Sequence, residues 1–367
     1  MIKKLSALLI VVALVAVACG DDDGAATTTT EGEAVTTTTA AEVGQDAGDT
    51  LATIRDRGVL ICGTNETLPG FGFREADGSF SGFDVDYCRA MAAAVLGDAT
   101  AVEFRPLTAA ERFTALQTGE IDILIRNTTW TQTRDTTLGA HFAPTTFYDG
   151  QGVAALGSAG FDGDSTIADL DGAIICTNAG TTTELNINEA IQLAGIADTT
   201  TVQTFEDFDQ VMNAFQAGSC DAITTDKSGL ISRKATAEPA AFRDDIVIFG
   251  LTLSKEPLGP MYRSNDPQFG DVADWTVYTT FIAEEKGITS ATLDDYLAAN
   301  PDDLEAQRLF GAAEDELQTG MGLDADAFYN VVSQVGSYEE IYNRNLGPDT
   351  VFNVPRGLNS LWIDGGL

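Results

Sequence analysis

The sequence predicts an α/β protein whose folded part consists of two similar lobes. Strand-like and helical segments alternate along the chain, as in sheets that are covered by helices. The order strand, helix, strand, helix, strand occurs twice, at 58–126 and at 172–226. In both copies the last helix ends in the motif Gly-x-x-Asp, at 119–122 and at 218–221. With 367 residues, 44% of them hydrophobic, the chain can build two such units.

The individual strands and helices are predicted from the period of the hydrophobic residues and from the residues that typically begin or end such elements. Short apolar or alternating runs predict strands at 58–64, 101–107, 121–126, 172–177, 201–205 and 221–226. Helical spacing predicts helices at 84–97, 109–120, 182–195 and 206–218. Beyond about residue 265 the chain is expected to be helical, with its clearest amphipathic stretch at 275–285.

The N-terminal segment is predicted to direct export. Lys3 and Lys4 precede an apolar run at 5–18, which is shorter than the roughly 20 residues that span a bilayer. We therefore expect residues 1–18 to be a signal peptide. The tetrapeptide Ala-Val-Ala-Cys at 16–19 resembles a bacterial lipobox, which makes Cys19 the lipidated first residue of the mature chain. Simple secretion is the alternative.

The segment after Cys19 is predicted to be a disordered tether. Residues 20–50 contain eight acidic residues, no basic residue and no aromatic residue, together with runs of threonine. Such a segment cannot bury enough apolar surface to offset its conformational entropy. We expect residues 19–50 to be an acidic, Thr-rich spacer between a lipid anchor and the folded lobes.

Composition excludes several kinds of site. The 20 Lys and Arg residues face 56 Asp and Glu residues, and the net charge of −36 argues against nucleic-acid binding. A single histidine, His141, excludes a His-rich metal centre. No phosphate-binding loop, dinucleotide fingerprint or nucleophile elbow occurs. We expect no metal, no cofactor and no catalytic residue.

Four further cysteines are predicted to form disulfides. An even number of cysteines in an exported chain favours disulfides over zinc, and no Cys-x-x-Cys spacing occurs. Three pairings are possible. We expect Cys62 to pair with Cys88 and Cys176 with Cys220, because the members of each pair lie close together in the sequence.

Several long motifs resemble the solute-binding proteins of ABC-type amino-acid importers, in particular their general L-amino-acid-binding branch. The first two motifs are Cys-Gly at 62–63 and Leu-Pro-Gly-Phe at 68–71. The others lie at 82–98, 106–139, 148–152, 180–186, 220–230, 254–260 and 336–347. The resemblance implies a two-lobed type II periplasmic-binding-protein fold with a hinge and a helical C-terminal extension. In this fold lobe 1 would comprise 51–147 and 252–367, and lobe 2 would comprise 148–251.

The resemblance also implies residues that bind the main-chain groups of an amino acid. Arg134 falls where the family binds the carboxylate, and a guanidinium can bind two carboxylate oxygens at once. The helix beginning at Thr181 and Thr182 would add its N-terminus, and Glu184 completes the pattern of a capping box. Asp226 falls where the family binds the ammonium group. Thr129 matches a hydroxyl contact, with Asn127 nearby.

Side-chain selection is expected from residues that differ among relatives. Asn65 and Leu68 stand where binders of basic amino acids carry an aspartate and an aromatic residue, and Arg126 adds a cation, so polar and acidic ligands are expected to bind best. Arg126 could instead pair with a neighbouring acid. Trp130 could line the cleft or belong to the core. We expect Arg112 on a helix surface or in lobe packing, with contact to the ligand as the alternative.

The expected function is therefore the capture of free L-amino acids outside the cytoplasm. The partners would be the permease subunits of an ABC importer, with a monomeric protein that contacts the membrane only through Cys19. A cofactor-free dehydratase acting on prephenate-like or arogenate-like acids is the alternative on the same fold, with His141 as its candidate base. A sensor module would need a transmembrane signalling segment.

Overall fold

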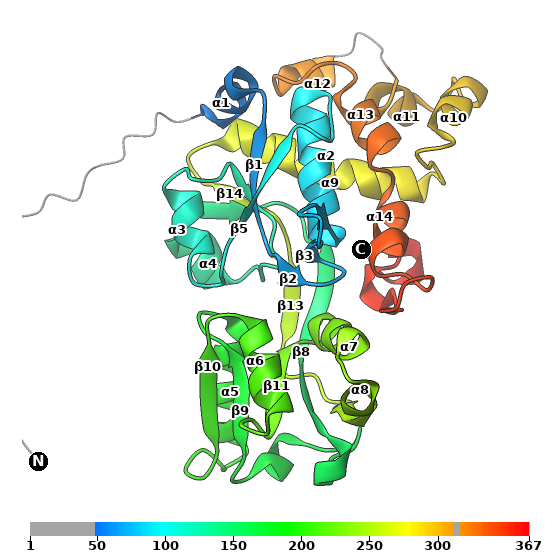
Figure 1. Ribbon diagram of the computed structural model, residues 1–367. Helices are drawn as coiled ribbons and strands as arrows, with labels where there is room; N and C mark the ends of the chain where they lie inside the picture. The colour runs from blue at the N-terminus through cyan, green and yellow to red at the C-terminus, as the bar shows by residue number, and fades with distance from the viewer. Residues whose placement is uncertain (1–47, 312–315, 367) are drawn as a thin grey trace, which may run out of the picture. The chain divides into compact units, whose positions relative to one another are not determined.

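The computed structural model describes residues 48–311 and 316–366 (Figure 1). The expected signal peptide at 1–18, Cys19 and almost all of the expected tether at 19–50 lie outside the described residues. Within the described part, no helix has both the length and the hydropathy needed to cross a membrane. Two α/β lobes are present, which appear in the upper and lower halves of Figure 1.

Lobe 1 is built on a five-stranded sheet with the order β5-β1-β6-β14-β7. Its strands are β1 (Leu60–Thr64), β5 (Val102–Pro106), β6 (Ile123–Leu124), β7 (Ala140–Phe142) and β14 (Met261–Arg263). Its helices are α1 (Thr50–Arg57), α2 (Phe83–Leu96), α3 (Arg112–Gln117), α4 (Gln132–Thr137) and α9 (Pro267–Glu285). Residues of α2 and α9 share one apolar core with the sheet, while α3 contributes to a second core on the other face. A small sheet lies beside α2 and consists of β2 (Thr67–Leu68), β3 (Gly72–Arg74) and β4 (Phe80–Ser81).

A helical extension completes lobe 1 at the C-terminal end of the chain, and the expectation of helix beyond residue 265 is confirmed. Its members are α10 (Leu293–Ala299), α11 (Leu304–Leu309), α12 (Glu316–Gly320), α13 (Ala327–Gln334) and α14 (Tyr338–Asn345). Both α13 and α14 pack on α2 and α9, so the extension enlarges the core of lobe 1. Short 3-10 turns follow at Gly357–Asn359 and Trp362–Asp364.

Lobe 2 has a sheet with the order β10-β9-β11-β8-β12, and β13 pairs with one end of β8. Its strands are β8 (Phe147–Leu156), β9 (Ile174–Asn178), β10 (Thr201–Phe205), β11 (Ala222–Asp226) and β12 (Ile246–Ile248). Its helices are α5 (Thr182–Leu193), α6 (Phe208–Gln216), α7 (Lys227–Thr236) and α8 (Ala240–Asp245), with 3-10 turns at Gly157–Ala159 and Ile167–Leu170. Alternate residues of β8 enter different cores, Val153 and Ala155 on one face and Ala154 on the other.

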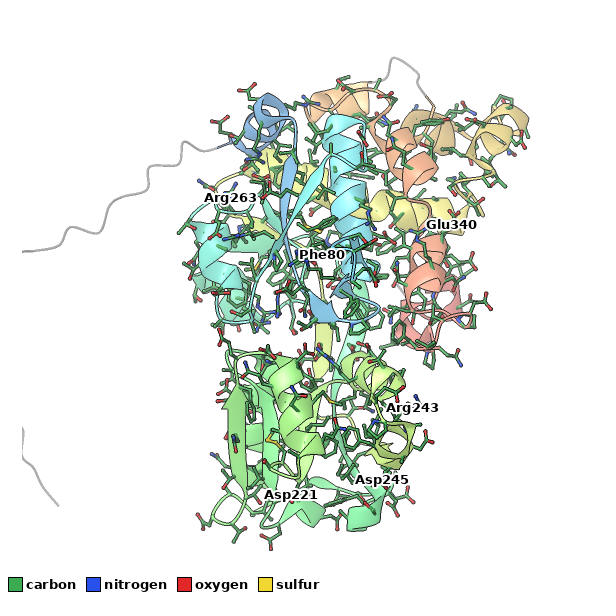
Figure 2. All side chains as sticks on the ribbon, viewed as in Figure 1. Phe80, Asp221, Arg243, Asp245, Arg263 and Glu340 are labelled. Atoms are coloured by element: carbon green, nitrogen blue, oxygen red, sulfur yellow. A yellow bond between two sulfur atoms is a disulfide. The ribbon has the colours of Figure 1, made fainter. Side chains whose placement is uncertain are left out.

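The internal repeat seen in the sequence is present in both sheets. The three parallel strands have the orders β5-β1-β6 and β10-β9-β11, and an antiparallel strand follows each set. In each Gly-x-x-Asp motif the glycine has a positive φ, 75° at Gly119 and 73° at Gly218. The aspartates accept hydrogen bonds from the first strand of each repeated parallel set, β1 and β9. Asp122 accepts from the Ile61 amide at 2.7 Å, and Asp221 (labelled in Figure 2) accepts from the Ile174 amide at 2.8 Å.

Two strands connect the lobes. β8 leaves lobe 1 and continues into the lobe 2 sheet, and β13 (Lys255–Leu258) returns beside it. Residues 147–150 pair with 255–258, while residues 151–155 pair with 222–226 of β11. The connection is therefore a two-stranded antiparallel ribbon whose further end is embedded in lobe 2.

The structure corrects several predicted elements. The helix predicted at 109–120 is shorter in the structure and is confined to α3. The strand predicted at 121–126 is likewise confined to β6. On its two sides, the Asp122 side chain bonds to the Ile61 amide and the backbone turns at Asn127, which has a φ of 33°. Neither β8 nor α7 was expected. Two glycines weaken the strand pattern of β8, and side chains would not fit there. A Cβ at Gly150 would lie 2.5 Å from Thr252, and one at Gly152 would lie 2.8 Å from Lys227.

Both expected disulfides are present. Cys62–Cys88 joins β1 to α2, and Cys176–Cys220 joins β9 to the residues before β11. Each bond thus connects two elements of one lobe, and the pairing expected from the sequence is confirmed.

Candidate functional site

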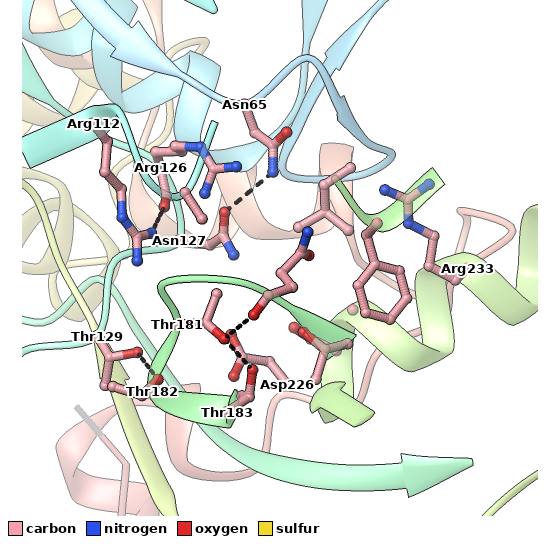
Figure 3. A pocket seen from close by; sticks show the side chains of 17 residues that line it. Asn65, Arg112, Arg126, Asn127, Thr129, Thr181, Thr182, Thr183, Asp226 and Arg233 are labelled. Atoms are coloured by element: carbon pink, nitrogen blue, oxygen red, sulfur yellow. Dashed lines mark hydrogen bonds between the residues drawn. The ribbon is translucent and has the colours of Figure 1, made fainter. Parts of the chain in front are cut away.

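A cavity lies between the lobes, where the parallel strands of both sheets end (Figure 3). Lobe 1 lines it with Asn65, Leu68, Ala109, Arg112, Arg126, Asn127 and Thr129. Lobe 2 lines it with Asn178, Thr181, Thr182, Thr183, Phe208, Thr225, Asp226, Ser228, Gly229 and Arg233. Polar and charged side chains predominate, so the cavity suits a small polar molecule.

Contacts between the lobes surround the cavity. The hydroxyls of Thr129 and Thr182 are 3.3 Å apart, and one hydrogen bond joins them across the gap. The Ser232 hydroxyl donates to the carbonyl oxygen of Pro69 at 2.6 Å, again from lobe 2 to lobe 1. The two lobes are therefore in a closed arrangement.

Three arginines of lobe 1 gather at one end of the cavity. Arg112 and Arg126 line it, whereas Arg134, the residue expected to bind a carboxylate, is not among the lining residues. Its guanidinium donates to the carbonyl of the lining residue Thr129 at 2.9 Å. The guanidinium groups of Arg112 and Arg134 both lie over the Phe113 ring, at 4.8 and 5.1 Å from its centre. In the described part of the chain, no carboxylate lies within ion-pair distance of any of the three.

The electrostatics of these arginines reflect their burial. Burial lowers the pKa of Arg126 and of Arg134 to about 10 in each case. Burial, followed by repulsion from Arg134 and Arg126, lowers the pKa of Arg112. The Nε atom of Arg112 finds no hydrogen-bond partner among the described residues. This end of the cavity therefore concentrates positive charge that no close ion pair neutralises among the described residues, although the carboxylates of Asp84, Asp226 and Glu256 act on it from further away.

Asp226 provides the only carboxylate among the cavity-lining side chains that the structure describes. It ends β11 and precedes α7, and its side chain is 93% buried (7% exposed). Its Oδ1 atom has no hydrogen-bond partner within the described residues. Burial raises its pKa well above the usual range, and the neighbouring carboxylates of Asp149 and Glu256 raise it further.

The other two carboxylates lie on the connecting strands and bind lobe 2. Asp149 and Glu256 are directly opposite each other in the pairing of β8 with β13. Asp149 accepts from the Ser228 amide near the start of α7, at 3.3 Å. Glu256 accepts from the Thr182 hydroxyl at 2.9 Å and from the Asn186 amide group at 3.0 Å, both on α5. The strands that join the lobes are thereby tied to the two helices that begin at the cavity.

The N-terminus of α5 faces the cavity through residues 181–183. The Thr181 hydroxyl accepts from the Glu184 amide at 3.1 Å, as the sequence predicts. The reciprocal bond is different: Glu184 accepts from the Gly180 amide at 2.8 Å rather than from that of Thr181. The expected capping box is thus only half formed, and the glycine has a φ of 72°.

Most of the expected site residues share this cavity. Those that line it are Asn65, Leu68, Arg126, Asn127, Thr129, Thr181, Thr182 and Asp226. Trp130 does not: its side chain stacks on Phe142 at 5.5 Å and is 38% exposed, so it is in neither of the environments expected for it. His141 is exposed and bonds to Asp135 at 3.3 Å, away from the cavity.

Arg112 does not lie on a helix surface, one of the positions expected for it, and Arg233 was overlooked. Arg112 is 3% exposed and lines the cavity instead of lying on a helix surface. Arg233 lines it from α7, together with Gly229 and Asp226. Gly229 follows Asp226 by three residues and Arg233 follows Gly229 by four, a spacing that places all three on one helix face. This spacing was the signal in the sequence that could have identified Arg233. Because α7 itself was not predicted, the spacing of Asp226, Gly229 and Arg233 could not be interpreted as a helix face.

Comparison with known proteins identifies the family. The profile of the bacterial extracellular solute-binding proteins, family 3, matches residues 60–238. The general L-amino acid-binding periplasmic protein AapJ of Rhizobium johnstonii is 44% identical over 320 residues, which are 87% of this chain and 91% of that protein. The glutamate/glutamine/aspartate/asparagine-binding protein BztA of Rhodobacter capsulatus is 43% identical over 328 residues, 89% of this chain and 94% of that protein.

A solved structure shares the fold. The ABC transporter/periplasmic binding protein from Brucella ovis, with glutathione bound, has a TM-score of 0.81 and 42% identity, and the match covers 87% of this chain and 98% of that one. The two-lobed periplasmic-binding-protein fold expected from the motifs is thereby confirmed. The chain belongs to family 3 of the bacterial extracellular solute-binding proteins.

Proposed function

We propose that the cavity binds a free L-α-amino acid and that the protein delivers it to an ABC importer. The observation that carries this proposal is the buried Oδ1 atom of Asp226, which faces the cavity without a donor from the described residues. Leaving a buried polar atom unpaired costs about 1–3 kcal/mol. The α-ammonium group of an amino acid would supply both the donor and the opposite charge.

The α-carboxylate would bind at the arginine-rich end. Arg112, Arg126 and Arg134 form no close ion pair among the described residues, and a guanidinium can donate two parallel hydrogen bonds to a carboxylate. Thr129 and Thr182 line the cavity from the two lobes, and the N-terminus of α5 adds its dipole. The zwitterionic main chain of an amino acid thus matches the separation of charge in the cavity.

The ligand range that we propose is broad, with polar and acidic side chains preferred over basic ones. Three of the charged side chains that line the cavity are arginines and one is an aspartate, which disfavours a cationic ligand side chain. The names of the relatives agree with this range, since one is a general L-amino acid-binding protein and another is named for glutamate, glutamine, aspartate and asparagine.

Transport would use lobe closure. Because the proposed contacts come from both lobes, a bound amino acid stabilises the closed arrangement, which a permease can then distinguish from the open one. We propose lobe 1 at 51–147 and 252–367 and lobe 2 at 148–251, and a monomer that acts outside the cytoplasm. Cys19 would carry the lipid that holds it at the membrane.

Calorimetry with the purified protein tests the binding proposal. We expect L-glutamate and L-glutamine to bind more tightly than L-lysine, and a ligand at about 100 times its Kd to stabilise the fold by about 2.7 kcal/mol. If no L-amino acid binds or raises the melting temperature, the proposal is wrong. Glutathione belongs in the same panel, because the similar Brucella ovis structure contains it.

The enzymatic alternative is tested in parallel. His141, the candidate base, is exposed and bonded to Asp135 away from the cavity, so we propose a binding protein without catalytic activity. Incubation with prephenate and arogenate should yield no aromatic product. Turnover of either acid would overturn this part of the proposal.

The anchor is tested at its cysteine. With Cys19→Ser we expect the protein to move from the membrane fraction to the soluble exported fraction, and the N-terminal peptide of the unaltered protein to carry the mass of a lipid. An N-terminal peptide of unmodified mass would favour simple secretion.

A further inference from the structure

A second cationic group faces the cavity from the other lobe. Arg233 lies on α7, seven residues after Asp226, and Gly229 lies between them on the same helix face. Seven residues span roughly 10 Å of helix, and helical side chains lean toward the N-terminus. Figure 3 shows Arg233 on the side of the cavity opposite Arg112. Its bond to Thr67 places the guanidinium next to lobe 1.

The guanidinium of Arg233 is buried and oriented, but it retains an unused donor. Its side chain is 9% exposed. One terminal nitrogen donates to Asp209 and the other to the Thr67 hydroxyl of lobe 1, at 3.3 Å. The ring of Phe208 lies 5.5 Å away and supports the group. Its Nε atom has no partner among the residues that the structure describes.

The ion pair with Asp209 leaves much of this charge available. The Asp209 side chain is 53% exposed, so water screens its carboxylate. Asp209 therefore orients the guanidinium, while a carboxylate inside the closed cavity would interact with it at lower dielectric.

We propose that Arg233 is a specificity-determining residue that binds the terminal carboxylate of an acidic ligand side chain. This inference rests on the proposed function, in which Asp226 and the lobe 1 arginines hold the main-chain groups. When the main-chain groups of the ligand are bound in this way, the Nε donor of Arg233 at the other side of the cavity still has no acceptor. The role expected for Arg126 passes to Arg233, because Arg126 lies with the lobe 1 arginines and donates its Nε proton to the Leu107 carbonyl at 2.7 Å.

Binding of L-glutamate and of its neutral isostere L-glutamine separates the two roles. For Arg233→Gln we expect the affinity for glutamate to fall about tenfold or more, the effect of losing a hydrogen bond to a charged group, and the affinity for glutamine to change less than about threefold. Arg233→Lys, which keeps the charge, should retain part of the preference for glutamate. Arg243→Gln is the matched control, because Arg243 lies on α8 away from the cavity and pairs with Glu238 and Asp244 (Figure 2).

The outcomes distinguish this inference from the function on which it rests. If the unaltered protein binds no amino acid, the proposed function fails. If it binds both ligands and Arg233→Gln weakens them equally, the proposed function stands and the role of Arg233 is wrong. Asp209→Asn removes the ion pair and keeps the cation, so glutamate binding should persist. A loss as large as that of Arg233→Gln would show that the ion pair, not the cation, matters.

Discussion

At the residue scale, Asp226, the residue proposed to bind the ammonium group, is kept in a state that is costly for the ligand-free protein. It lies in the N-cap position of α7, yet its side chain makes no capping bond, and Asp149 bonds near the helix start instead. The Oδ1 atom thus stays unpaired beside two other carboxylates. Such an arrangement is expected where a cation from outside the chain completes the site.

The role of Asp226 leads to a prediction. Asp226→Asn should weaken L-glutamate binding by about 2–5 kcal/mol, the scale for removing one partner of a buried charge pair. Glutarate, which has both carboxylates and no ammonium group, should be affected far less. Calorimetry with both ligands measures the difference, and Asp198→Asn at an exposed position is the control. Equal losses for glutamate and glutarate would mean that Asp226 acts on the fold.

At the element scale, α7 connects the cavity to lobe closure. One side of the helix lines the cavity through Gly229 and Arg233, and the neighbouring Ser232 donates to Pro69 of lobe 1. A Cβ at Gly229 would approach Leu68 of lobe 1 at 4.0 Å, so the helix lies close to the opposite lobe along this face.

Removing the Ser232 hydroxyl should therefore affect closure alone. For Ser232→Ala we expect all ligands to lose about the same affinity, roughly fivefold, since one net hydrogen bond contributes about 1 kcal/mol. Calorimetry with glutamate and glutamine checks this. Thr236→Ala is the control, because that hydroxyl bonds only to the Ser232 carbonyl of the same helix. A loss confined to one ligand would indicate direct contact rather than closure.

The lobe 2 disulfide gives a second prediction at this scale. Cys176–Cys220 closes a segment with a sequence separation of 44 residues. Its removal by Cys176→Ala with Cys220→Ala should destabilise lobe 2 by about 2–4 kcal/mol, because the unfolded chain gains conformational entropy. Urea unfolding followed with and without reductant measures the effect. An unchanged midpoint would show that the sheet alone fixes these elements.

The elements also show how far the sequence could be interpreted. The parallel strands and their helices were predictable, because the hydrophobic period and the glycines at the helix ends indicate the same elements. α7 was not, since it begins directly after β11 without a connecting loop and contains Gly229, which lowers helix propensity. Most of the expected residues that line the cavity came from the family motifs. The burial of Arg112 and the contact of Arg233 with Thr67 depend on how two distant segments meet.

At the scale of the whole molecule, buried carboxylates make stability depend on pH. Burial raises the pKa of Asp84 to about 7 and that of Asp149 to about 6, and it raises that of Asp226 as well. The folded state therefore binds protons more tightly than the unfolded state between about pH 4 and pH 7. Stability from these groups is present at low pH and is lost as the pH rises through the folded-state pKa values.

We accordingly expect the melting temperature of the ligand-free protein to fall between pH 5 and pH 8. Asp149→Asn should reduce the slope, with a difference of about 1–3 kcal/mol in unfolding free energy across the range. Carboxylates with lowered pKa values, such as the exposed Asp98 and the partly exposed Asp303, act below this window. Scanning calorimetry at several pH values tests the prediction, and a melting temperature that rises with pH would contradict it.

The position of β14 has a consequence for the order in which the two sheets can be completed along the chain. All five strands of the β10-β9-β11-β8-β12 path lie before residue 249. The other sheet needs a later segment, because β14 lies between β6 and β7 and is followed by α9 and the helices that cover the core. A chain truncated near residue 250 would therefore hold every strand of one sheet and leave the other with exposed strand edges, which chaperones and proteases recognise.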